Sequence, residues 1–211
     1  MPDRVSYPGM KTGYFVVAEL TGRALEEVSA VQRLHDPKLA NGSTPHITIV
    51  GSSGVGPIAL GTPVTRMREL LEPITRTTPP ITVHFGPPIR FMQTEIIVLP
   101  LDPHGELRTL HERIATSGLV FDQARFQFSP HCTLSFFPTI TPAVQRKLLA
   151  LRIEAPMVIE RLQVYQTLDP QPSKKVLELE LGAGDAGSGM RDAERPSGES
   201  RNATGDSSRD S

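Results

Sequence analysis

The sequence predicts an α+β protein with two pseudo-symmetric lobes, each an antiparallel sheet with helices on its outer face, and a cleft between the lobes. The main observation is a repeated motif. Thr-Pro-His-Ile-Thr-Ile at residues 44–49 returns as Ser-Pro-His-Cys-Thr-Leu at residues 129–134. Both copies follow a strand, a helix and a polar loop and precede another helix, and an internal repeat of this kind indicates a duplicated unit.

Each motif is expected to be a strand with one polar and one apolar face. Successive side chains of a strand point to opposite faces, so His46 and Thr48 share one face. His131 and Thr133 do the same in the second copy, and apolar residues occupy the alternate positions of both motifs. Two lobes related by a pseudo-twofold axis would bring the two polar faces together across the cleft.

Around the first motif, hydrophobic periodicity and turn residues define the elements. An apolar, β-rich segment precedes a stretch in which apolar residues recur at helical spacing from Leu25 to Leu34. Pro45 stands at a strand start, where its missing N–H is tolerated. The expected order is strand 13–20, helix 21–34, polar loop 36–44, motif strand 45–50, glycine-rich loop 51–61 and a helix over residues 63–75 that ends before Pro79 and Pro80.

The second half repeats this order. Pro87 and Pro88 are expected to bend or interrupt its first strand, and Gly118 to end its first helix. Thr141 followed by Pro142 is typical of a helix start. The expected elements are strands 81–91 and 94–101, helix 103–117, loop 123–129, motif strand 130–137, helix 141–151, and strands 157–168 and 175–181.

The chain is expected to contain one folded domain, at residues 12–182. Residues 1–11 form a short N-terminal segment. Residues 183–211 mix Ser, Asp, Arg and Glu with very few apolar residues, so they bury too little apolar surface to offset the entropy of ordering. We expect this C-terminal tail to be disordered and without a catalytic role.

Composition excludes several classes of protein. The net charge is −1 and no block of basic residues occurs, which argues against an extended duplex nucleic acid as a partner. The single cysteine, Cys132, allows neither an internal disulfide nor a zinc site built from several cysteines. No apolar run approaches the ~20 residues that span a bilayer, and residues 1–11 lack a signal-peptide core. We expect a cytoplasmic monomer that does not contact membranes.

Two histidines facing one cleft suit the cleavage of a phosphodiester. The reaction needs a base for the nucleophile and an acid for the leaving oxygen, and a usual pKa of ~6.5 lets one imidazole be neutral while the other is protonated. The hydroxyls of Thr48 and Thr133 could donate to phosphate oxygens as their negative charge grows. This arrangement requires neither a metal nor a cofactor. His46 and His131 are therefore the predicted catalytic residues, and Thr48 and Thr133 the predicted substrate-binding residues.

At these residues the chain resembles the two-histidine phosphoesterase superfamily, in particular the proteins related to 2'-5' RNA ligase and 2',3'-cyclic nucleotide phosphodiesterase. The resemblance covers roughly residues 12–182 and rests on His46-Ile47-Thr48-Ile49 and His131-Cys132-Thr133-Leu134. It implies a bilobal α+β fold, an active site in the cleft and metal-independent hydrolysis of a cyclic phosphate or related phosphodiester. It also implies that His46 protonates the leaving oxygen and that His131 activates water.

The expected substrate is an RNA end or small nucleotide that carries a 2',3'-cyclic phosphate. Joining or cutting 2'-5' linkages, or hydrolysing a cyclic oligonucleotide, remains an alternative, and so does a module that binds RNA ends without turnover. Some relatives carry a basic residue after the second motif, whereas Ser135, Phe136 and Phe137 follow it here. Phe137 would stack on a base or pack at a strand end.

Other conspicuous residues have plainer interpretations. Cys132 alternates with His131 and should therefore lie in the core. His104 and His111 lack further ligands at a diagnostic metal spacing and are expected to be exposed helix residues. The role of His84 is left open, because its strand could place it on the cleft. His35 lies near a helix end, where an interaction with the helix dipole accounts for it. The glycine-rich segment 51–56 lacks the Gly-Lys-Ser/Thr end of a phosphate-binding loop and is expected to be a mobile loop or rim beside the first motif. Three further basic residues lie near loops and could steer a phosphate, but we expect them to be ordinary solvated surface charges: Arg90, Arg125 and Lys174.

Overall fold

The structure is a computed structural model that describes residues 12–91, 94–101, 105–124, 126–136, 141–168 and 171–182. The predicted N-terminal segment and C-terminal tail lie outside these ranges. In chain order the described elements are β1 (Gly13–Glu19), α1 (Gly22–His35), α2 (Pro37–Gly42), β2 (His46–Val50), α3 (Val64–Arg76), β3 (Ile81–Val83), β4 (Ile89–Arg90), β5 (Ile97–Pro100), α4 (Glu106–Ala115), β6 (His131–Ser135), α5 (Pro142–Ala150), β7 (Met157–Ile159), β8 (Arg161–Thr167) and β9 (Lys174–Glu180).

Seven strands form one antiparallel sheet in the order β4-β5-β6-β2-β1-β8-β9, and β3 pairs with β7 in a separate ribbon. The predicted α+β class is confirmed. The strands of the two repeated halves share this sheet because the motif strands β2 and β6 are neighbours, with Ile47 opposite Cys132. The centre of the sheet is therefore the place where the two halves of the repeat meet.

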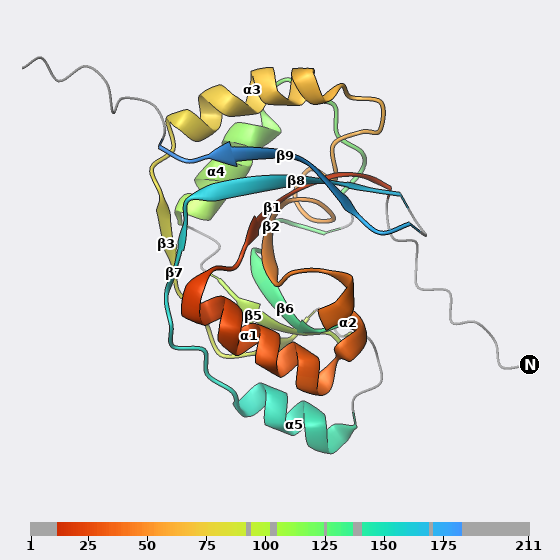
Figure 1. The fold of residues 1–211 in the computed structure, drawn as a ribbon, viewed down its shortest axis with the longest axis vertical. Helices are drawn as coiled ribbons and strands as arrows, with labels where there is room; N and C mark the ends of the chain where they lie inside the picture. Colours follow the sequence, from red (N-terminus) through yellow and green to blue (C-terminus); the bar gives the residue numbers. More distant parts are fainter. Residues whose placement is uncertain are drawn as a thin grey trace, which may run out of the picture.

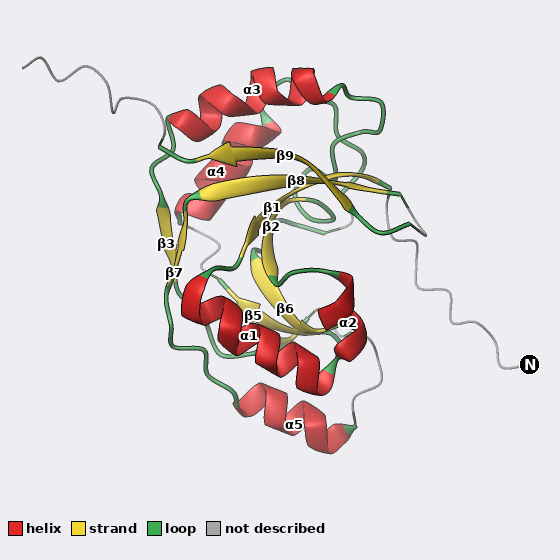
Figure 2. Cartoon of the chain, in the orientation of Figure 1, coloured by secondary structure: helices red, strands yellow, loops and turns green. Residues whose placement is uncertain are grey.

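The helices are distributed symmetrically about that centre. Helix α1, from the first half, packs against β6 of the second half, while α4, from the second half, packs against β2 of the first half. As Figure 1 shows, α3 and α4 lie at one end of the molecule and α1, α2 and α5 at the other. The strands run between these two groups of helices (Figure 2). Each motif strand is thus supported from behind by the helix of the other half.

Two of the described helices, α5 and α2, start at a residue whose side chain caps the helix. Thr141 caps α5, because its side chain accepts a hydrogen bond from the backbone N–H of Val144. The same device produces α2, a short helix inside a segment that the sequence predicted to be a loop. Asp36 accepts a hydrogen bond from Leu39 N at 3.0 Å, and Pro37 occupies the first turn, where its missing N–H costs nothing.

Two predicted strands are divided in the structure. The stretch at 81–91 becomes β3 and β4, because Pro87 and Pro88 have no N–H to donate and interrupt the ladder, as anticipated. The stretch at 157–168 becomes β7 and β8, which belong to different sheets. The division at Glu160 lets the chain leave the small ribbon and enter the large sheet.

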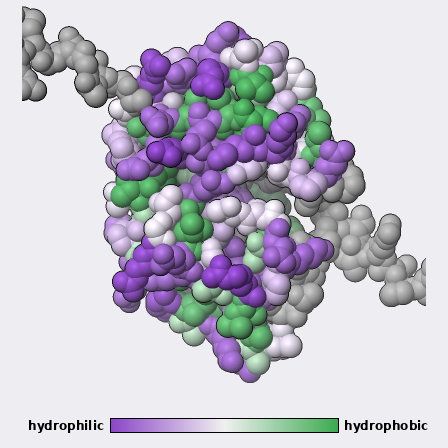
Figure 3. All heavy atoms as spheres, viewed as in Figure 1, coloured by the Kyte–Doolittle hydropathy of each residue, from purple (hydrophilic) through white to green (hydrophobic). Residues whose placement is uncertain are grey.

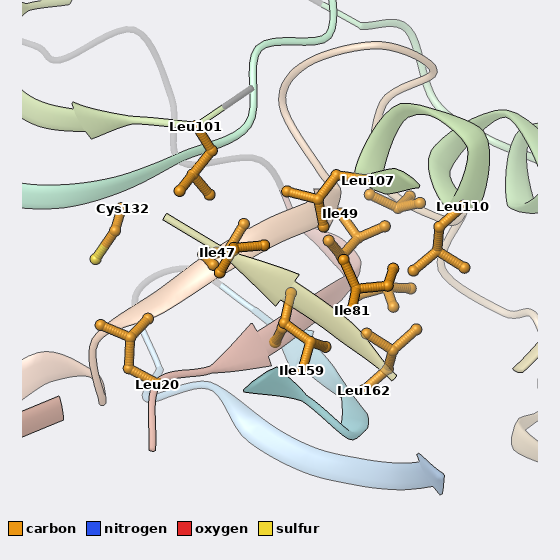
Figure 4. Packing of buried hydrophobic residues seen from close by; sticks show 14 of the residues in the cluster. Leu20, Ile47, Ile49, Ile81, Leu101, Leu107, Leu110, Cys132, Ile159 and Leu162 are labelled. Carbon is orange, nitrogen blue, oxygen red and sulfur yellow. The ribbon is translucent and has the colours of Figure 1, made fainter. Parts of the chain in front are cut away.

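A single apolar core joins the two halves. Ile49 of β2 lies among the α4 residues Leu107 and Leu110, and Ile47 lies between this group and Cys132 of β6 (Figure 4). Polar residues cover most of the described surface in the view of Figure 3, with apolar residues in separate patches. Within the described ranges, no helix has the length and apolar character needed to cross a membrane.

Candidate active site

The four residues singled out by the repeat lie on two neighbouring strands. The pairing of Ile47 with Cys132 is antiparallel, so it sets His46 opposite Thr133 and Thr48 opposite His131. All four side chains then project from one face of the sheet. The two histidines are diagonal neighbours, and the Cα atoms of such neighbours are roughly 7–8 Å apart. This separation leaves room for a phosphate between two imidazoles.

Burial fixes that face. The two strands share one burial pattern, in which His46, Thr48, His131 and Thr133 are half-buried while the residues between them are buried. Ile47 and Cys132 are completely inaccessible to solvent. A slip of one residue in either strand would expose its apolar side chains and bury the imidazole, so the core enforces the register.

Both imidazole rings are held by the same backbone contact. His46 Nδ1 lies 2.7 Å from Thr44 O, and His131 Nδ1 lies 2.7 Å from Ser129 O. A carbonyl oxygen can only accept a hydrogen bond, so each Nδ1 carries the proton and donates it. In the neutral form, Nε2 of each ring is then the nitrogen available to take a proton from a ligand.

The electrostatic surroundings of the two rings differ. Burial lowers the pKa of His46, while its hydrogen bond to Thr44 and the negative charge of Glu19 act in the opposite direction. Burial also lowers the pKa of His131; the bond to Ser129 opposes this, and the charge of nearby His46 adds to it. The influence of His46 on His131 follows from the closeness of the two rings in the structure.

Helices of the opposite half hold the backbone of both motif strands. Gln32 of α1 donates its side-chain amide to Thr133 O at 2.8 Å. His111 of α4 donates from Nδ1 to Ile49 O at 2.8 Å. At the end of β6, the buried carboxylate of Asp36 accepts the backbone N–H of Phe136 at 2.7 Å. These contacts fix the strand positions from which the four polar side chains project.

The predicted exposure of His111 is wrong. The residue is 4% exposed, and its ring stacks on that of Phe128, with ring centroids 4.0 Å apart. Gly54 lies against the same ring, since a Cβ at that position would come within 2.2 Å of it. His111 therefore has a structural contact on each side and anchors the glycine-rich segment, which also donates from Gly54 N to Phe126 O at 2.9 Å.

The prediction that Cys132 lies in the core is confirmed. The thiol is buried, and burial raises the pKa of Cys132 to about 12. His84 is exposed beyond the end of β3, and His35 is in the last turn of α1. Arg90 pairs with Glu95 on the surface, and Lys174 is exposed. Three further residues considered from the sequence lie outside the described ranges: His104, Arg125 and Phe137.

Sequence reasoning missed two neighbours of the histidines. Glu19 lies opposite His46 on β1, and Phe91 places its ring centroid 4.6 Å from that of His131. Glu19 did carry a signal, because it is the one charged residue of an otherwise apolar strand. Phe91 carried none, since it reaches His131 only through the pairing of β4, β5 and β6.

A cavity of about 430 Å³ adjoins the His46 side of the site. Its lining comes from the ends of β1 and β7 and from the polar face of β8 and β9, and it includes Glu19, Arg161, Gln163, Lys175 and Glu178. Neither histidine lines it. Among the residues that the structure describes, no three His, Cys, Asp or Glu side chains cluster in a way that could hold a metal ion.

The antiparallel α+β fold and the paired His-x-Thr strands define a protein of the two-histidine phosphoesterase class. A family model described as the 2'-5' RNA ligase superfamily matches residues 20–171, a span that includes both motifs. The chain therefore belongs to the 2'-5' RNA ligase superfamily. This membership supports an enzyme of phosphoester chemistry. No curated protein sequence matched the chain significantly.

Solved structures share the fold at low sequence identity. The apo form of LigT from E. coli is 16% identical, with a TM-score of 0.52, and the match covers 81% of this chain and 97% of LigT. LigT complexed with 3'-AMP is also 16% identical, with a TM-score of 0.51 and coverage of 81% and 98%. The protein TT0787 of Thermus thermophilus is 14% identical, with a TM-score of 0.53 and coverage of 82% and 98%.

Proposed function

We propose that this chain is a metal-independent phosphodiesterase that opens a 2',3'-cyclic phosphate on an RNA end or nucleotide, with His46 and His131 as acid and base. The observation that carries the proposal is the matched orientation of the two rings on neighbouring strands. Each ring donates a hydrogen bond from Nδ1 to the backbone carbonyl two residues earlier, which leaves Nε2 for a ligand. Acid–base catalysis at phosphorus needs two such groups on opposite sides of the reacting atom.

In the proposed reaction, neutral His131 takes a proton from water at Nε2 as the water oxygen attacks phosphorus. Protonated His46 gives its Nε2 proton to the ribose oxygen that leaves, so one P–O bond forms, one breaks, and a phosphomonoester remains. Thr48 and Thr133 donate their hydroxyls to the two non-bridging oxygens, where negative charge increases in the transition state. The histidines end with their protonation states exchanged, and solvent restores them.

Structural neighbours support a small nucleotide or RNA end as the ligand. LigT has been crystallised with 3'-AMP and with NADP+. A nucleoside 3'-phosphate is one of the two products that opening a 2',3'-cyclic phosphate can give. The site on this chain offers the polar groups that such a phosphate needs, since two hydroxyls and two imidazoles share one face of the sheet.

Phosphorus NMR on purified protein tests the proposal. With a 2',3'-cyclic nucleotide or an oligonucleotide ending in a cyclic phosphate, and with EDTA present, we expect the cyclic signal to be replaced by a phosphomonoester signal. His46→Ala and His131→Ala should each lower kcat/KM by about 10²–10⁴-fold, the usual contribution of a positioned acid or base. His84→Ala replaces an exposed histidine and should leave the rate unchanged.

Two results would overturn the proposal. Full activity in both histidine variants would remove the acid–base mechanism, and no turnover of any cyclic phosphate by the wild-type protein would remove the substrate. In the second case, tight binding of the same ends without turnover would identify an RNA-end binding module.

Formation or cleavage of 2'-5' linkages is the second candidate, and the description of the matching family favours it. The same acid and base working in reverse would join a cyclic phosphate to a ribose hydroxyl with no change in the site. The two functions separate on product analysis. Incubation of cyclic-phosphate ends with oligonucleotides bearing free 5' hydroxyls would give a longer product resistant to a 3'-5'-specific nuclease only if ligation occurs.

A further inference from the structure

The two histidines of the site have different neighbours in the sheet. On β1, Glu19 lies directly opposite His46. On β5, the residue directly opposite His131 is Pro100, which carries no charge. Opposite residues of an antiparallel pair have Cβ atoms about 4.5–5.5 Å apart. Among the residues directly opposite the two histidines on β1 and β5, both of them described, a carboxylate therefore stands across from His46 and none stands across from His131.

Glu19 is held in place from the next strand. Its backbone N–H donates to Oε1 of Gln163 at 3.0 Å, and the hydroxyl of Tyr165 donates to its side-chain oxygen Oε1. Both partners belong to β8, the neighbour of β1 on the side away from the histidines. Burial and the contact with Glu19 raise the pKa of Tyr165 to about 12, so the phenol remains a donor over the whole neutral range.

Few other described charges face His46. On β6 the facing groups are Thr133 and His131. A protonated His131 would repel a protonated His46. On α4, which packs behind β2, His111 contacts Ile49 O on the core side. Arg161, Lys175 and Glu178 line the adjoining cavity. Among the described residues, Glu19 is thus the negative group directly opposite His46.

We propose that Glu19, held by Tyr165, is a positioning residue that keeps the proton shared by the histidine pair on His46. On the function proposed above, this makes His46 the general acid and His131 the general base. A carboxylate favours the charged form of an adjacent imidazole, and the charge on His46 then disfavours a second proton on His131. The asymmetry of the neighbours divides the roles within an otherwise symmetric pair.

Glu19→Gln tests this inference, because it keeps the shape of the side chain and its hydrogen bond with Tyr165 but removes the charge. NMR titration of the two histidine rings should show the pKa of His46 falling by about one unit relative to wild type. In the pH profile of kcat/KM, the alkaline limb reports the acid and should move to lower pH by the same amount. The two rings titrate as a coupled pair, so both signals must be followed together.

Two further variants make the test specific. Glu178→Gln removes the same charge from the same face of the sheet, but Glu178 pairs with Lys175 and should leave the His46 titration unchanged. Tyr165→Phe keeps the charge of Glu19 but removes the hydrogen bond that holds the Glu19 side chain. It should therefore lower the pKa of His46 by a smaller amount than Glu19→Gln does. Tyr165→Phe also provides the test if Glu19→Gln does not fold.

The inference is overturned if Glu19→Gln changes only the pKa of His131, or changes the pKa of neither ring. It is also overturned if Glu178→Gln lowers the pKa of His46 as much as Glu19→Gln does. Its failure differs from failure of the proposed function. If the wild-type protein hydrolyses no cyclic phosphate while the His46 titration still responds to Glu19, the function is wrong and the placement of the proton stands. If hydrolysis occurs and His46 does not respond, the reverse holds.

Discussion

The two motif strands are nearly identical along the chain and different across the sheet. Along the chain, β2 and β6 have the same burial pattern, and their histidines make the same 2.7 Å contact with the carbonyl two residues earlier. Across the sheet, His46 faces Glu19, whereas His131 faces Pro100 and has the ring of Phe91 beside it.

The difference between the two strands separates two requirements of an acid–base site. The orientation of a ring depends on its own strand, so a repeated motif reproduces it. The preferred protonation state depends on neighbouring strands, which the repeat does not duplicate. A pair of equal histidines can therefore acquire unequal roles without any change within the motif itself.

Thr48 and Thr133 occupy equivalent positions on β2 and β6, and their replacement is expected to have the largest effect of the changes considered below. Thr48→Val and Thr133→Val remove a hydroxyl with little change of shape. If both hydroxyls bind the phosphate, kcat/KM for a cyclic phosphate should fall by about 10²-fold in each variant, the typical cost of losing one donor to a developing oxyanion. Initial rates under kcat/KM conditions measure this loss.

Thr82→Val on β3 is a matched control, because Thr82 is exposed in the separate ribbon. Equal losses at Thr48 and Thr133 would mean that the symmetry extends to the substrate. A large loss at one position only would mean that the phosphate sits nearer to one strand. Rates close to wild type in both variants would contradict a role for either hydroxyl.

Phe91, whose ring lies beside His131, is expected to have a smaller effect. Its ring lies 4.6 Å from that of His131 and tilted by 39°. Contacts between aromatic rings contribute about 0.5–1.5 kcal/mol, so Phe91→Leu should lower kcat by up to about tenfold through a less restrained His131. KM should change little, because on this view Phe91 acts on the base and not on the substrate.

Phe126→Leu is the control for Phe91. Phe126 meets Phe91 edge-on at 6.1 Å and is 42% exposed, and its replacement keeps the Phe91–His131 contact. A rise in KM in both variants, with kcat unchanged, would contradict the positioning role and indicate that the two rings contact the substrate directly.

The sequence predicted what depends on short-range chemistry. Strand alternation assigned His46 and His131 to a polar face and Cys132 to the core, and the Thr141-Pro142 pair marked the start of α5. The exposure predicted for His111 was wrong for a reason that was also local. His111 follows Leu107 by four residues and precedes Ile114 by three, so helical periodicity places it on the apolar face.

Features that depend on strand order were beyond sequence reasoning. Glu19 approaches His46 because β1 lies between β2 and β8, and Tyr165 reaches Glu19 across 146 residues of chain. Phe91 approaches His131 through two intervening strand pairings. Alternation says which face a side chain occupies but not which strand lies beside it. The four motif residues were therefore predictable, whereas the groups that differentiate them were not.

His111, the buried histidine outside the motif strands, is expected to affect activity least. Its replacement should instead change how the free energy of unfolding depends on pH. Burial lowers the pKa of His111 in the folded protein. Below about pH 6.5, the usual value for a histidine, the unfolded chain therefore binds more protons at this position than the folded one. Stability is full above that pH and should fall as the pH drops, by at most about 1.4 kcal/mol per pH unit for one group.

His111→Asn keeps a donor near the position of Nδ1, for Ile49 O, and removes the titration. Urea unfolding at several pH values between 7.5 and 5 should show a shallower acid loss of unfolding free energy in this variant than in wild type. His46 and His131, whose pKa values burial also lowers, would account for part of the slope that remains. The exposed His84, replaced in the same way, should leave the slope unchanged. An unchanged slope in His111→Asn would mean that His111 does not contribute to the acid loss of stability, and would contradict this prediction.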